Sequence, residues 1–279
     1  RLAQGHPGDR EAMLLAARAY AQLGRLAEAE AYFTQIPLRA PDDLRLRARS
    51  LETRRLWSEA ASVYEQLLHR QPADGETLQH LAAIRVQQDR PQEALILARR
   101  LVQVRDYEAV GLVIAAMVEN QMGNLAGAVA DFEEALRLSP DLKGVPTERW
   151  EVLELLAQAL IELGRAEEAE KYALQVQQQS SGPTPCFILG QARQQLGDED
   201  GAYNYWKEAL ARDPKHLLSI LEIAQLHLRR RNLEEAMTWA QRARELEPDN
   251  GTINYLINTI RKHSEQRGKS GDPSNSDSP

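Results

Sequence analysis

The stretch Met117–Pro140, MVENQMGNLAGAVADFEEALRLSP, contains two helical patterns joined by a short turn. The first pattern ends at Gly123, because glycine can adopt a positive φ and end a helix without steric cost. The second pattern has a small residue at Ala128 and an aromatic one at Phe132, and it stops before the closing proline, which cannot continue a helix. The stretch therefore predicts one antiparallel pair of helices.

The same arrangement occurs seven times along the chain, counting this stretch. The alanines that open the second helices, at intervals of 31, 34, 34, 41, 33 and 34 residues, are Ala29, Ala60, Ala94, Ala128, Ala169, Ala202 and Ala236. The turn residues, five positions earlier, are Gly24, Arg55, Asp89, Gly123, Gly164, Gly197 and Arg231. A positive φ should cost about 1 kcal/mol at each arginine. A period of this length predicts stacked helical units.

Two further positions in each unit are predicted to pack against their neighbours. Small residues in the first helices should let two helix backbones approach closely; they are Ala17, Ala48, Ala82, Ala116, Ala157, Gly190 and Ala224. Packing residues in the second helices, four positions after the opening alanine, are Phe33, Tyr64, Ala98, Phe132, Ala173, Trp206 and Ala240.

These repeated positions resemble the tetratricopeptide repeat (TPR) family, in which each unit of about 34 residues is a helix–turn–helix. The resemblance covers approximately residues 10–250. It implies an all-α fold, namely a right-handed superhelical solenoid of antiparallel helix pairs with a C-terminal capping helix. It also implies that the working surface is a concave inner face lined by the first helices.

The register divides the chain into six segments. Residues 1–9 are expected to be the remnant of a preceding repeat, because Pro7 lies 34 residues before Pro41. The other expected segments are repeats 1–4 at 10–140, an inter-repeat insertion at 141–149, repeats 5–7 at 150–250, a capping helix at 251–263 and a disordered tail at 264–279. The 31-residue interval before Ala60 predicts a missing helical turn near Asp42–Leu44, at the start of a first helix.

Composition and charge exclude several functional classes. The net charge of −7 argues against a nucleic-acid partner, which would need a basic face. The sequence contains no run of about 18 apolar residues, so no membrane span is predicted. The single cysteine, Cys186, rules out an intrachain disulfide, and no signal peptide is visible, so a cytoplasmic location is expected.

No catalytic, cofactor or metal site is predicted. Cys186 occupies a position held by leucine or isoleucine in other units, and a buried structural thiol is expected there. No two histidines have the (i, i+4) spacing of a helical metal site, and no glycine-rich run could cradle a phosphate. The sequence therefore favours a protein that is not an enzyme.

The candidate partner-binding groove combines apolar and basic residues on the inner face. Its predicted members are Val110, Val113, Ile114, Met117, Phe187, Ile188, Arg45 and Arg49. Exposed apolar residues on such a face often mark a partner site, but a neighbouring unit could instead cover them. The arginines could dock an acidic peptide or pair with nearby acids such as Asp42, Asp43, Glu52 and Glu59, and Arg229–Arg231 beside Glu234 and Glu235 present the same alternatives.

The leading functional hypothesis is a scaffold or adaptor that binds a peptide or helix of a partner protein in the concave groove. The alternative is a regulatory or substrate-presenting arm of a larger enzyme, such as a transferase, kinase or peptidase, whose catalytic domain lies upstream of residue 1. Self-assembly through open repeat ends is a third possibility.

Overall fold

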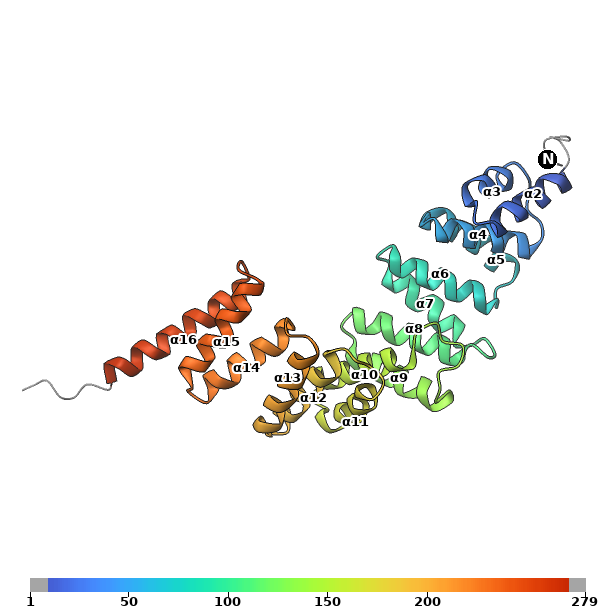
Figure 1. The fold of residues 1–279 in the computed structure, drawn as a ribbon. Coiled ribbons are helices and arrows are strands. Elements are labelled where there is room, and N and C mark those ends of the chain that lie inside the picture. Colours follow the sequence, from blue (N-terminus) through green and yellow to red (C-terminus); the bar gives the residue numbers. More distant parts are fainter. Residues whose placement is uncertain (1–9, 271–279) are drawn as a thin grey trace, which may run out of the picture. The chain divides into compact units, whose positions relative to one another are not determined.

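The structure, a computed structural model, describes residues 10–270, with side chains placed up to residue 266 (Figure 1). The described residues form α-helices joined by turns, with no β-strand among them. The chain divides into two compact units, one ending at Glu148 and the other beginning at Arg149. The all-α fold class is confirmed.

The first unit contains four helix pairs, and consecutive helices pack against each other. Its first helices are α2 (Arg10–Gln22), α4 (Pro41–Thr53), α6 (Gly75–Gln87) and α8 (Glu108–Gln121). Its second helices are α3 (Leu26–Phe33), α5 (Trp57–Arg70), α7 (Pro91–Leu101) and α9 (Leu125–Leu138).

The second unit contains three helix pairs and one further helix. Its first helices are α10 (Arg149–Glu162), α12 (Thr184–Gln195) and α14 (Leu217–Arg229). Its second helices are α11 (Ala166–Gln177), α13 (Glu199–Arg212) and α15 (Leu233–Leu246). The additional helix, α16 (Gly251–Ser270), packs against α15 and α14.

The predicted register is confirmed at the turns and at the helix contacts. All seven turn residues have positive φ, from 57° at Asp89 to 82° at Gly197. Each alanine that opens a second helix is fully buried, because it lies where the paired helices approach most closely. At Gly190 the indole of Trp206 occupies the space that a Cβ would need, which explains a glycine at that small-residue position.

The missing turn predicted near Asp42–Leu44 lies elsewhere. Helix α4 has 13 residues, as many as α2 and α6, whereas α3 has only 8. The short interval before Ala60 therefore comes from the second helix of the first pair. Consequently Pro41 does not close a helix but begins α4, where a missing N–H and a fixed φ are well tolerated.

Helix α16 covers the last helix pair with its apolar side. Ile253, Ile257 and Ile260 are buried against the core of the second unit. Most earlier first helices bury an aliphatic or thiol side chain at one position and a small residue four positions later. The equivalent residues of α16 are Asn254 and the exposed Asn258. That side of α16 is therefore hydrophilic, as a capping helix requires.

Helix α16 continues to Ser270, so residues 264–270 are helical where disorder is predicted. Glu, Gln, Arg and Lys dominate this extension and favour helix, and the next proline comes only at Pro273. The predicted repeat remnant at 1–9 and the rest of the tail at 271–279 lie outside the described residues. Within residues 10–270 no helix is both long enough and apolar enough to span a bilayer.

Candidate functional site

An apolar hollow of about 410 Å³ is lined by α6 and α8, with contributions from α4 and from the segment before residue 148, on the face predicted above to be the inner one. We call it the inner groove. Its apolar residues are Ala83, Val86, Ile114, Met117 and Val118. Three uncharged amide side chains stand around them, those of Gln79, Gln87 and Gln121.

Met117 is the most informative residue of the inner groove, because the fold does not require it. Its side chain is 38% exposed. The equivalent positions in the other six units hold Arg18, Arg49, Ala83, Gln158, Gln191 and Gln225. Only this unit places a large apolar side chain there, and Ile114 lies one helical turn away on the same side of α8.

One wall of the inner groove is an ordered polar cluster. The carboxylate of Glu52 accepts a hydrogen bond of 2.8 Å from the hydroxyl of Tyr64 and lies 3.0 Å from Nδ1 of His80. The ring of His80 stacks on Tyr64 with centroids 5.5 Å apart. Arg49 pairs with Glu76, whose carboxylate also lies 4.0 Å from Nε2 of His80.

Burial and hydrogen bonding act in opposite directions on the pKa of Glu52. Burial raises it, but the hydrogen bond and charge of His80, the Tyr64 hydroxyl and the charge of Arg49 together hold the pKa of Glu52 below its ordinary value. Burial and the Glu52 carboxylate raise the pKa of Tyr64. Glu52 is therefore a stable anion and Tyr64 a stable hydrogen-bond donor at neutral pH.

Four of the six apolar residues predicted for the groove are buried instead. Val110 belongs to the same core cluster as residues of α4 to α7, so the preceding units cover this part of α8, and Val113 is also buried. Phe187 and Ile188 are buried in the second unit, where Phe187 also makes an edge contact with His216 at 5.3 Å. Of the two alternatives, exposure or coverage by neighbouring residues, coverage holds for these four, and of the six predicted apolar residues Ile114 and Met117 line the hollow.

The predicted basic residues are paired with acids. Arg45 lies 2.9 Å from Asp42 and 3.0 Å from Asp74, and Arg49 pairs with Glu76. Arg47, in the same helix, contacts Glu30 at 2.6 Å. The structure therefore favours the neutralised arrangement over an open basic surface at Arg45 and Arg49.

A second basic run also has partners, but not the predicted ones. Arg230 contacts Glu199 at 2.9 Å and Asp200 at 2.8 Å, and Arg229 lies 3.8 Å from Glu199. These acids belong to α13, in the preceding helix pair, rather than to Glu234 and Glu235 beside the run.

Cys186 is buried, as predicted for a structural thiol. Burial, together with the neighbouring Glu208 carboxylate, raises its pKa to about 11. The thiolate needed for nucleophilic chemistry is therefore a minor form at neutral pH.

Sequence reasoning missed several residues that line the inner groove. Val86 and Gln87 lie one turn beyond Ala83 on α6, and Gln121 lies one turn beyond Met117 on α8. Helical periodicity carried one turn further would have included them. Pro146 and Thr147 come from the predicted insertion, and only the folded chain shows that they reach the groove.

Comparison with known families supports the repeat assignment. Two tetratricopeptide repeat family profiles match, one at residues 1–52, 120–181 and 194–258, and the other at residues 45–109. A search of curated proteins found no match.

Solved structures share the fold at low sequence identity. The C-terminal part of a TPR protein from Cytophaga hutchinsonii matches with a TM-score of 0.68 and 14% identity, over 88% of this chain and 99% of that one. YrrB, described as a TPR protein with an unusual peptide-binding site, matches with a TM-score of 0.59 and 18% identity, over 72% and 99%. The APC/C hetero-tetramer Cut9–Hcn1 matches with a TM-score of 0.60 and 13% identity, over 93% of this chain and 50% of that one.

The family profiles cover most of the chain, and the helix pairs, turns and buried alanines have the geometry that the repeat requires. Such repeats are generally non-catalytic. The chain belongs to the tetratricopeptide repeat family, whose arrays serve in general as protein-interaction scaffolds.

Proposed function

We propose that the protein is an interaction scaffold that binds a peptide segment of a partner in the inner groove, with an apolar side chain of that peptide against Met117 and Ile114. The observation that carries this proposal is the exposed Met117 within an apolar hollow, at a position where the other units have Arg, Gln or Ala. A hollow of about 410 Å³ falls within the size range of ligand sites.

The polar residues around the hollow suit a peptide backbone. Each glutamine amide both donates and accepts hydrogen bonds, so Gln79, Gln87 and Gln121 can pair with peptide N–H and C=O groups without demanding a charged ligand. The Glu52–His80 pair fixes one wall, because both groups already have partners within the protein. The apolar contact should then supply most of the affinity and the amides should fix the register.

The groove is tested by selecting binders from a displayed library of random 12-residue peptides with the whole folded chain. Met117→Glu and Ile114→Glu should each weaken the selected peptides at least tenfold in fluorescence anisotropy, because each places a charge in the apolar contact. Met122→Glu is the matched control. Met122 follows α8 directly and is 43% exposed, but it does not line the groove.

Selected peptides that bind Met122→Glu like the wild type and fail on Met117→Glu would support the proposal. Peptides that bind all variants equally would contradict it, provided that circular dichroism shows the variants to be folded.

A further inference from the structure

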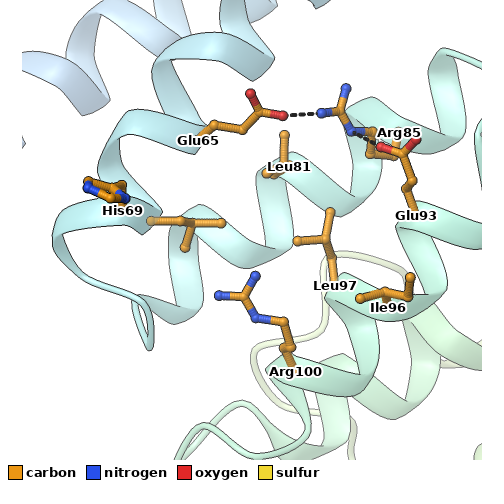
Figure 2. Close-up of a pocket in the computed structure, with 9 residues that line it drawn as sticks. Glu65, His69, Leu81, Arg85, Glu93, Ile96, Leu97 and Arg100 are labelled. Carbon is orange, nitrogen blue, oxygen red and sulfur yellow. Dashed lines mark hydrogen bonds and ion pairs between the residues drawn. The ribbon is translucent and has the colours of Figure 1, made fainter.

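Helix α6 has a second hollow on its opposite side, facing away from Gln79 and Ala83. This hollow, of about 410 Å³, lies between α5 and α7 and is named here the outer groove (Figure 2). Its floor consists of Leu68, Leu81 and Leu97, which are almost fully buried. Two features of its rim distinguish this hollow.

The first feature is an isoleucine on the rim. Ile96 is 62% exposed, and it lies two positions after the opening alanine of α7. The equivalent residues in the other units are all exposed and small or polar: Ala31, Ser62, Ala130, Lys171, Asn204 and Thr238. The repeat therefore has no structural need for a large aliphatic side chain at this position.

The second feature is an uneven distribution of charge around the groove. On one side, the buried guanidinium of Arg85 pairs with Glu65 and lies 3.0 Å from Glu93, as the dashed lines in Figure 2 show. Glu93 also contacts Arg90 at 2.5 Å. Both carboxylates are thus neutralised by the protein itself.

On the other side of the groove lie Arg100 and His69, apart from the ion pairs in Figure 2. Arg100 donates one hydrogen bond of 3.0 Å to the carbonyl of Pro72, which holds its side chain in place. Among the described residues no carboxylate pairs with Arg100. Its charge is therefore oriented, exposed and available to a ligand.

Spacing along α7 links the two features. Ile96 and Arg100 are four residues apart, so they lie on the same side of the helix, separated by about 6 Å along its axis. That separation matches an aliphatic and an acidic side chain three or four residues apart on a helical ligand. A basic ligand would instead meet Arg100 with like charge.

We propose that the outer groove binds an acidic amphipathic helix of a partner protein, with an aliphatic side chain against Ile96 and Leu97 and a carboxylate on Arg100. This site is separate from the inner groove, since the two hollows share no residue. The scaffold would then hold two ligands on opposite sides of α6.

The test uses designed helical 16-residue peptides labelled with fluorescein, titrated against the whole chain in fluorescence anisotropy. One peptide carries Leu and Glu four residues apart along one side, and its partner peptide carries Lys in place of that Glu. We expect the Glu peptide to bind the wild type and to lose at least tenfold in affinity on Ile96→Glu and on Arg100→Glu. Arg70→Glu, an exposed arginine at the end of α5 that does not line the groove, should change affinity less than twofold.

A charge exchange makes the test specific. The Lys peptide should bind Arg100→Glu better than it binds the wild type, because the ammonium group of the peptide then meets a carboxylate instead of a guanidinium. The proposal is overturned if the Glu peptide does not bind the wild type, if it binds Arg100→Glu as well as the wild type, or if Met117→Glu abolishes its binding. The last result would assign the peptide to the inner groove. Conversely, the inner groove can fail its own test without affecting these titrations.

Discussion

The two grooves of α6 have similar volumes but different construction. The inner groove exposes the apolar side chain of Met117 beside three neutral amides and the Glu52–His80 pair. The outer groove has a floor of core leucines and a rim of charges. One repeat helix can therefore contribute to two surfaces, one with a partly exposed methionine and one with a floor of core leucines and a rim of charges.

The largest expected contrast is in stability. Leu81→Ala should lower the free energy of unfolding by about 2–5 kcal/mol, because it leaves a cavity beneath the outer groove. Met117→Ala should cost less than about 1 kcal/mol, since its side chain is already partly in water. Urea unfolding followed by circular dichroism measures both. Equal losses would show that the inner groove is also part of the core.

The rim of the outer groove should matter less than its floor. Arg85→Ala removes a buried guanidinium that pairs with Glu65 and Glu93, and we expect a loss of about 1.5–3 kcal/mol. The loss should stay below that for Leu81→Ala, because both carboxylates are about half exposed and can be hydrated. Glu65→Gln is the control that keeps the arginine. An Arg85→Ala loss larger than the Leu81→Ala loss would contradict this ordering.

Acid should lower the stability of the fold partly through Glu52, which lies in the wall of the inner groove. Because the pKa of Glu52 is lower in the folded protein than its ordinary value, ionised Glu52 stabilises the fold above about pH 4.3. That contribution is lost as the pH falls through the lower folded pKa. Glu52→Gln should therefore show a shallower loss of stability below about pH 4.3, measured by urea unfolding across the acid range. If the free energy of unfolding had the same pH dependence in the wild type and in Glu52→Gln, ionised Glu52 would contribute nothing to stability.

The smallest effects should come from the two residues assigned to recognition. Met117→Gln and Ile96→Ser introduce residues that other units carry at the same positions. Each should change the free energy of unfolding by less than about 0.5 kcal/mol, because exposed positions contribute little to folding. Thermal and urea unfolding test this. A loss above about 1 kcal/mol at either site would indicate a structural role instead.

The sequence predicted the backbone of this fold better than its surfaces. Seven turns and seven buried alanines follow from repetition, because only certain residues tolerate a positive φ or a close helix contact. An interval between alanines counts residues without saying which helix lost them, so the shortened α3 was placed wrongly in α4. Likewise, periodicity within α8 identifies the side that carries Val110 and Val113 but not the neighbour that buries them.

The outer groove was not predicted because three helices build it. Its ion pairs also cannot be recognised by comparing the residue types at equivalent positions of the repeats. Arg85 pairs with Glu65, twenty residues earlier, and in the next unit Glu119 pairs with Arg99 at 2.8 Å across the same interval. The acid and the base have exchanged places between the two units, while the ion pair is kept. Neither of the two repeat positions therefore has a consistent residue type.

Helix α16 has a consequence for how the repeats could be rearranged by design. Asn254 and Asn258 replace the buried aliphatic and small residues of earlier first helices. Joining another helix pair after α16 would place these two polar amides in a helix contact that earlier pairs fill with apolar and small residues. Replacing them with leucine and alanine would give α16 the residue types on which a further helix pair can pack. These two asparagines therefore oppose the addition of a repeat after α16.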